Sequence, residues 1–250
     1  MKNNDLRHIL TEQEQMSESF ILSAFLAFSG GFQDSYTYIV RGHVFANAQT
    51  GNIVLMSTSF LQKNWLLGLR YLYPIFAFVL GVLIADAVDK KMNKASFLHW
   101  RQLILIFEIC ILFAVGFLPE TLNVPANVLV SFSCAMQVQA FRTVGGGITY
   151  ASTMCVGNLR GGTAALSDFL HSKNKSDLHR ALYYFGVICI FALGAGIGAI
   201  ASLHFSYRTV WACCAILLLA LLLMDLDRSK NKKKKVKDEK KDKKELDHKL

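Results

Sequence analysis

Long uncharged apolar runs alternate with short charged segments along most of this chain. The clearest run, Ala181 to Leu203, has 23 residues without a charge. A helix needs roughly 20 mostly apolar residues, at about 1.5 Å each, to cross the hydrocarbon core of a membrane. By this test the pattern predicts six spanning helices, over Ser19–Val40, Tyr71–Val88, Phe97–Leu118, Val124–Thr143, Ala181–Leu203 and Tyr207–Met224. We therefore expect an all-α fold, a polytopic membrane helix bundle.

Two further segments, His43–Gln62 and Gly147–Leu170, are apolar but interrupted by small and amide residues. Each contains a Gly-Asn pair, Gly51-Asn52 and Gly157-Asn158. Glycine lets the backbone leave helical geometry, and asparagine offers hydrogen bonds to the backbone groups that this frees. Either the segments are broken or re-entrant, giving six spans, or they cross as polar helices, giving eight.

The distribution of Lys and Arg distinguishes these two topologies, because such residues in short loops mark the cytoplasmic side. With both segments re-entrant, nine of them fall on the cytoplasmic side and four outside. With both segments crossing, five fall inside and seven outside. The count favours six spans with both termini in the cytoplasm.

The two Gly-Asn segments belong to a longer internal similarity. A shift of 106 residues places the first pair on the second and Gln33 on Gln139, and a further seven-residue insertion places Gly81 on Gly194. If each half has three spans, an odd number, the halves have opposite orientations, which is the 3+3 inverted repeat of many secondary transporters. Chance similarity between apolar segments is the alternative.

Composition and charge divide the chain into three parts. A polar segment, 1–18, is expected in the cytoplasm, and residues 19–224 form the membrane domain, with repeat halves at about 19–118 and 124–224. From Asp225 to Leu250 there are eleven Lys and one Arg against seven acidic residues, although 53% of the whole chain is apolar. Such a tail is expected to be disordered and attracted to anionic lipid headgroups. No recognition motif accompanies it, so a nucleic-acid partner is not expected.

Two stretches carry a resemblance to a known family, GGFQDSYTYIVRGHVFANAQTGN (Gly30–Asn52) and AMQVQAFRTVGGGITYASTMCVGNLRGGTAAL (Ala135–Leu166). They resemble the YoaK-like family of bacterial integral membrane proteins, which is defined by a domain of unknown function. The resemblance covers roughly residues 19–224, although Val156 stands where the family commonly has Thr. It implies six spans in the bacterial cytoplasmic (inner) membrane and no established activity.

Charged side chains inside spans are the candidate functional groups. Inserting one into the membrane costs roughly 2.5–3.5 kcal/mol, so such a side chain usually faces a cavity or a partner. We predict a solute pathway lined by Asp34, Asn52, Glu108, Arg142, Asn158 and Arg160, helix breaks at Gly51 and Gly157, and close helix packing at Gly81, Gly194 and Gly198. The structural alternatives are local. Asp34 would pair with Arg142 or cap a helix near the interface, and Arg160 would pair with Asp168 or Glu108. Glu108 would pair with Arg142 or Arg160, or would be a protonated carboxyl group hydrogen-bonded to a neighbouring helix.

The pattern favours a secondary transporter or channel for a small polar or anionic solute. The alternative is a membrane scaffold or lipid-binding regulator that acts through helix packing and the basic tail, with a second copy of the chain as one candidate partner. The chain has no GxSxG or HExxH motif and no paired His or Cys spacing, so we expect no enzymatic activity, cofactor or metal.

Overall fold

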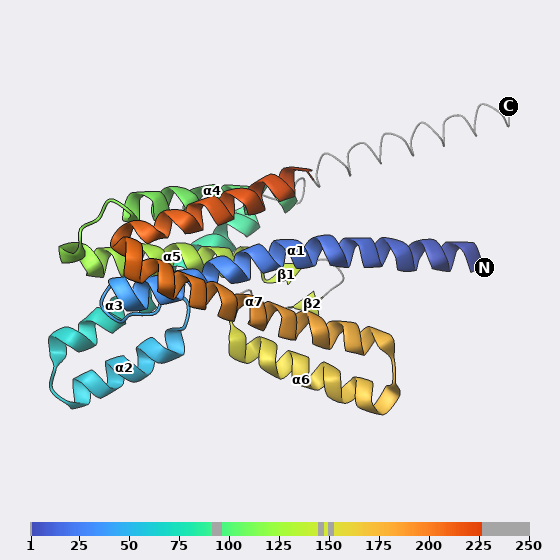
Figure 1. Cartoon of the computed structure of the whole chain (residues 1–250), viewed down its shortest axis with the longest axis horizontal. Helices are drawn as coiled ribbons and strands as arrows, with labels where there is room; N and C mark the ends of the chain where they lie inside the picture. The colour runs from blue at the N-terminus through green and yellow to red at the C-terminus, as the bar shows by residue number, and fades with distance from the viewer. Residues whose placement is uncertain (1, 92–96, 145–147, 150–152, 227–250) are drawn as a thin grey trace.

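The computed structural model describes residues 2–91, 97–144, 148–149 and 153–226, and among these the side chains of 20–91, 100–142 and 153–226 (Figure 1). The described helices are α1 (Lys2–Val40), α2 (Gln49–Leu61), α3 (Trp65–Lys91), α4 (Phe97–Val115), α5 (Asn123–Ala140), α6 (Cys155–Ser172), α7 (Lys175–Phe205) and a last helix over 210–226. Short 3-10 turns, η1 (Glu120–Leu122) and η3 (Ser206–Thr209), precede α5 and the last helix. Strands β1 (Thr143–Val144) and β2 (Ile148–Thr149) pair antiparallel.

Each of the six predicted spans overlaps a helix, although Thr143, the predicted end of the fourth, lies in β1 beyond the end of α5. The two Gly-Asn segments contain the shorter helices α2 and α6. The start of the first span is the main difference, because α1 begins at Lys2 rather than near Ser19. No Gly or Pro occurs between these two residues, so nothing in the backbone interrupts the helix before the polar segment ends. Most of the predicted basic tail, 227–250, lies outside the described residues.

The helices form two hairpins and two crossed pairs. α2 and α3 pack side by side, as do α6 and α7, while α1 packs mainly on α7 and α3 mainly on α5. The turn between α2 and α3 lies at one end of the long axis, and the turn between α6 and α7 lies toward the other, short of the start of α1 (Figure 1). The two hairpins therefore point in opposite directions along the bundle.

Glycines allow the closest approach at both crossings. A Cβ on Gly194 of α7 would overlap the carbonyl oxygen of Phe28 on α1, and a Cβ on Gly81 of α3 would overlap the carbonyl oxygen of Phe132 on α5. Gly198 lies one turn beyond Gly194, where a Cβ would stand 2.8 Å from Cα of Phe32. Small residues let helix backbones approach in this way in membrane proteins.

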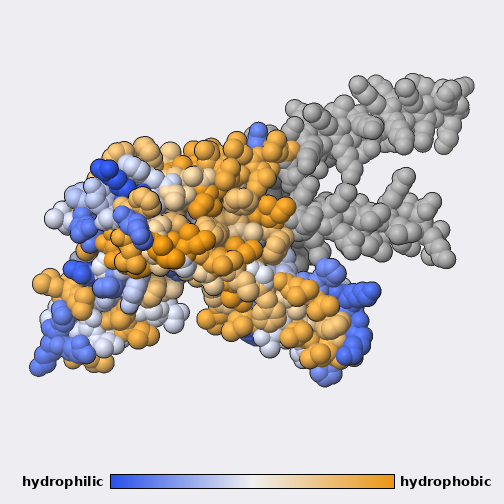
Figure 2. Space-filling view, in the orientation of Figure 1, coloured by the Kyte–Doolittle hydropathy of each residue, from blue (hydrophilic) through white to orange (hydrophobic). Residues whose placement is uncertain are grey.

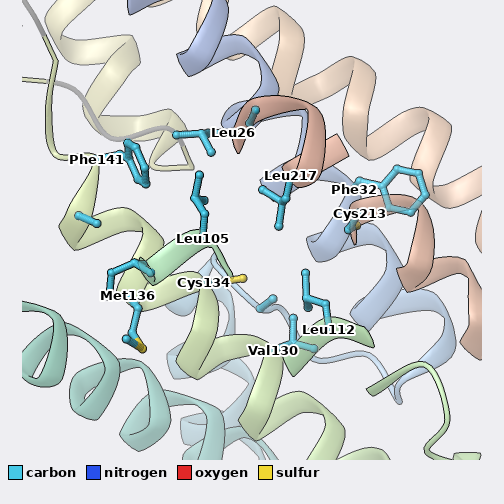
Figure 3. Packing of buried hydrophobic residues seen from close by; sticks show 14 of the residues in the cluster. Leu26, Phe32, Leu105, Leu112, Val130, Cys134, Met136, Phe141, Cys213 and Leu217 are labelled. Atoms are coloured by element: carbon cyan, nitrogen blue, oxygen red, sulfur yellow. The ribbon is translucent and has the colours of Figure 1, made fainter. Parts of the chain in front are cut away.

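The largest apolar core lies where α1, α4, α5 and the last helix meet (Figure 3). Its fully buried side chains include Leu26, Leu105, Leu112, Phe141 and Leu217. These side chains join the N-terminal helix to the C-terminal one, so both halves of the chain share one core.

On the face that Figure 2 shows, the described surface is largely apolar in the middle and hydrophilic near the α2–α3 turn and the α6–α7 turn. Two described helical stretches are long and apolar enough to cross a membrane, Trp65–Lys91 and Lys175–Leu226. In the most apolar 18 residues of each, only 28% and 39% of the residues, respectively, are buried inside the protein. Leu80 on α3 and Leu193 on α7 are thus exposed, whereas Gln33 is completely buried. Polar groups inside and apolar groups outside suit a bundle surrounded by lipid.

Candidate functional site

A cavity of about 870 Å³ lies where α2 and α6 begin, between α1, α3 and α7. A hollow between the α2–α3 hairpin and the α6–α7 hairpin is visible in Figure 2. The cavity is lined by Asp34, Ser35, Tyr38, Ile39, Phe45, Asn47, Ala48, Gln49, Thr50, Ile53, Ile75, Phe78, Val79, Thr153, Met154, Cys155, Val156, Gly157, Phe191, Ala195 and Ala199. Asp34 is the one charged side chain among these residues, and most of the others are apolar.

The first Gly-Asn pair stabilises the loop that leads into α2. Asn52 accepts the backbone N–H of Phe45 at 3.0 Å and donates to the carbonyl of the same residue at 2.8 Å. A Cβ on Gly51 would lie 2.9 Å from the Phe45 ring, so glycine makes room for that ring, which stacks on Tyr38 with centroids 4.8 Å apart. The pair, which lies within the first turn of α2, thus fixes an aromatic wall of the cavity and satisfies backbone groups of the loop before that helix.

Asp34 holds the same loop from α1. Its Oδ1 accepts the backbone N–H of Asn47 at 2.6 Å, and the side-chain amide of Asn47 donates to the carbonyl of Gly30 at 3.2 Å. Asp34 is only 5% exposed. A carboxylate beside the start of a helix is favourable because the N-terminal end carries partial positive charge.

The second Gly-Asn pair lies at the start of α6. The first three residues of this helix, Cys155, Val156 and Gly157, all line the cavity, and the N-cap residue Met154 makes no side-chain capping hydrogen bond. Asn158 is buried within the first turn. The starts of α2 and α6 therefore face one cavity from different sides.

Glu108 lies in a separate buried polar cluster and is not among the cavity-lining residues. Gln33 on α1 donates to its carboxyl group at 3.1 Å, and Gln137 on α5, with its amide nitrogen turned toward Glu108, donates at 2.9 Å. The thiol of Cys134 donates to the side-chain amide oxygen Oε1 of Gln33 at 2.7 Å. Amides, rather than the arginines considered as ion-pair partners, thus hold this carboxyl group.

Arg142 and Arg160 are exposed and do not line the cavity. The carboxylate of Asp168, considered as a partner of Arg160, instead accepts a hydrogen bond from Arg180 at 2.9 Å. Of the predicted pathway residues, Asp34 lines the cavity directly, while Asn52 and Asn158 lie buried behind its wall.

Arg41 is a buried charge that is not among the predicted site residues. It is 0% exposed and donates to Tyr36 Oη at 2.8 Å and to the carbonyls of Val115 and Pro119 at 3.0 and 3.2 Å. Val115 ends α4, so the guanidinium lies at the negative end of that helix. Nothing in the local sequence pattern signals this role, because its carbonyl acceptors come from a segment more than 70 residues away.

Comparison with known proteins places this arrangement among membrane proteins. Residues 22–223 match the family model described as "Protein of unknown function (DUF1275)". The chain is 26% identical over 200 residues to the UPF0700 transmembrane protein YoaK of Bacillus subtilis (strain 168), and the match covers 76% of this chain and 87% of that protein. No solved structure matches the chain. The family match confirms the resemblance seen in the sequence.

Proposed function

The chain belongs to the DUF1275 family of transmembrane proteins, and within it we propose that this protein is a secondary transporter or channel that binds a small polar or anionic solute in the cavity between α2 and α6. The observation that carries the proposal is the meeting of two helix starts at one cavity inside an apolar bundle. Paired discontinuous helices at corresponding positions mark the solute site in many transporters.

Helix lengths support a site near the middle of the membrane. α2 has 13 residues and α6 has 18, or about 20 Å and 27 Å at 1.5 Å per residue. Both are shorter than the hydrocarbon core of about 30 Å. Phe78 and Phe191, which line the cavity, lie near the middles of α3 and α7. This arrangement supports six spans with α2 and α6 entering partway.

The packing also supports an inverted repeat, with a revised register for its first helices. In each half a glycine packs against the carbonyl of a phenylalanine, Gly194 against Phe28 and Gly81 against Phe132. Treating these two crossings as equivalent aligns Phe28 with Phe132, which is a shift of 104 residues. That shift aligns FSGGFQD (28–34) with FSCAMQV (132–138), so that Gln33 matches Gln137 rather than Gln139. Both of these glutamines donate to Glu108, which supports equivalent roles for α1 and α5.

The six-span arrangement, together with the distribution of Lys and Arg, leads us to propose that both termini are in the cytoplasm of a bacterial cell and that the basic tail lies near anionic lipid headgroups. The turn between α2 and α3 would then face outward and the turn between α6 and α7 inward. Their positions at opposite ends of the bundle support this orientation.

Uptake into proteoliposomes that contain the full chain tests the proposal. A panel of radiolabelled amino acids, monocarboxylates, amines and polyols is assayed for saturable uptake above protein-free liposomes. Ala199→Phe fills part of the cavity, whereas Ala192→Phe makes the same change at an exposed position of α7 outside the cavity lining. We expect uptake of at least one solute to be lost in the first variant and kept in the second.

Two results would contradict the proposal. The first is uptake of no panel member above protein-free liposomes. The second is equal uptake in the two variants, provided that both reconstitute as monodisperse protein. Either result would remove transport through the cavity as the function of this arrangement.

A further inference from the structure

Glu108 is an acid that the bundle buries completely. It lies near the middle of α4, and no ion pair among the described residues includes it. An ionised carboxyl group is costly at membrane depth without a cation beside it. A proton removes the charge and needs no additional space, so it is the counterion that this closed core can accommodate.

The groups that contact the carboxyl oxygens suit a proton better than a metal ion. Nε2 of Gln33 donates to Oε1 of Glu108 at 3.1 Å, and one end of the Gln137 amide lies 2.9 Å from Oε2. An amide offers donors at one end and an acceptor at the other. With its nitrogen toward Glu108, Gln137 donates to a carboxylate, and with its oxygen there it accepts the proton of a neutral carboxyl group. A hard metal ion would instead need several oxygen ligands.

The other titratable groups near Glu108 are thiols. Cys134 on α5 and Cys213 and Cys214 on the last helix interact with it electrostatically, while α1 presents the neutral amide of Gln33. A thiol carries no positive charge in either protonation state. None of these groups can therefore neutralise an ionised Glu108, which leaves the carboxyl group itself to take up the proton.

Polar side chains extend from Glu108 toward the cavity. The thiol of Cys134 donates to the side-chain oxygen of Gln33 at 2.7 Å, and the nitrogen of the same amide donates to Glu108. Asn47, which lines the cavity, lies beside that thiol. Asp34, on the cavity lining, and Glu108 both act electrostatically on the thiol. The two carboxyl groups thus belong to one polar region that reaches the cavity.

Both halves of the bundle hold Glu108. Gln33 comes from α1 and Gln137 from α5, the helices that the revised register makes equivalent. Transporters with inverted repeats move one half against the other around a fixed site. A carboxyl group that bonds to both halves is placed to stay bound while access changes from one side of the membrane to the other.

We propose that Glu108 is the proton-binding site that couples solute uptake to a proton gradient. Its carboxylate takes a proton from water on one side of the membrane, and the neutral carboxyl group returns it to water on the other side, so no further reactant is needed. Because the polar region reaches the solute cavity, proton and solute travel in the same direction. This inference rests on the proposed function, since it adds the driving ion to the same transport cycle.

Accumulation in proteoliposomes tests the inference for every panel solute that the full chain takes up. Uptake is compared with and without an inward proton gradient, while valinomycin and equal potassium on both sides hold the membrane potential at zero. With one proton for each solute molecule, a gradient of about one pH unit supports up to about tenfold accumulation. Pyranine trapped in the lumen reports the accompanying proton, and we expect acidification when unlabelled solute is added.

Glu108→Gln keeps one acceptor for the surrounding amides but has no carboxyl group to protonate. We expect labelled solute to reach only equal concentrations on the two sides in this variant, with or without the gradient. Glu120→Gln makes the same change at an exposed glutamate, and it should accumulate solute as the unmodified chain does.

Three results would overturn the inference. The unmodified chain could take up solute without response to the gradient, or without a change in lumen pH, and neither of these measurements depends on a variant. Glu108→Gln could also accumulate solute as far as Glu120→Gln does. Absence of uptake for every panel solute would instead contradict the proposed function itself.

Discussion

Gly194→Ala is predicted to separate α1 from α7 and to destabilise the bundle. The added methyl group would overlap the carbonyl oxygen of Phe28 and lie 2.9 Å from its Cα, and backbone atoms cannot turn away as a side chain can. Overpacking costs up to about 3 kcal/mol, and replacing Gly by Ala in a helix returns about 1 kcal/mol. We therefore expect a net loss of about 2 kcal/mol.

Gly196 provides a matched control two residues away on the same helix, because a Cβ there would meet nothing within 4 Å. At about 2–4 °C per kcal/mol, Gly194→Ala should lower the unfolding temperature by roughly 4–8 °C. Gly196→Ala should leave it unchanged or raise it by about 2–4 °C, because it gains only helix propensity. Thermal unfolding of both full-length proteins in the same detergent measures the difference. Equal unfolding temperatures would refute the close crossing of α1 and α7.

Three further changes test the buried polar groups. Arg41→Met leaves several carbonyl and hydroxyl acceptors unpaired and should cost about 3 kcal/mol or more in unfolding free energy, whereas Met at exposed Arg208 should change it by less than about 0.5 kcal/mol. Glu108→Leu removes the acceptor of two buried amides and should lower the free energy of unfolding by about 2 kcal/mol or more. Glu108→Gln keeps one acceptor and should lower it by about 1 kcal/mol. Equal losses in the two variants would refute the amide cluster. Asn52→Ala should increase hydrogen exchange at the Phe45 amide up to about tenfold, and unchanged exchange would contradict the role of Asn52 in holding the loop.

The periodic features of the fold could be predicted from the sequence. Mostly apolar runs long enough to cross a membrane indicated the positions of six helices, and the Gly-Asn pairs indicated two shorter ones. The helix start at Lys2 was not predicted, because the search followed hydrophobicity and a polar helix carries no such signal.

The site was predicted less completely because its contacts join distant segments. Asp34 was identified as a costly charge within a span, but the residue it holds, Asn47, follows a loop whose path the sequence does not reveal. Glu108 was also identified, yet its partners depend on the register between the two halves. Aligning the two halves with a shift of 106 residues matches the Gly-Asn pairs but places Gln33 on Gln139, two positions beyond Gln137.

The opposite orientation of the two hairpins is the central claim, because it brings the starts of α2 and α6 to one cavity. Single cysteines at Gln62 and Lys175, both exposed beside the two turns, can be labelled with a membrane-impermeant maleimide in a chain whose six native cysteines are replaced. We predict that Gln62→Cys reacts only from outside the cell and Lys175→Cys only from the cytoplasmic side of inverted vesicles. Reaction of both from the same side would contradict the inverted arrangement and the shared cavity.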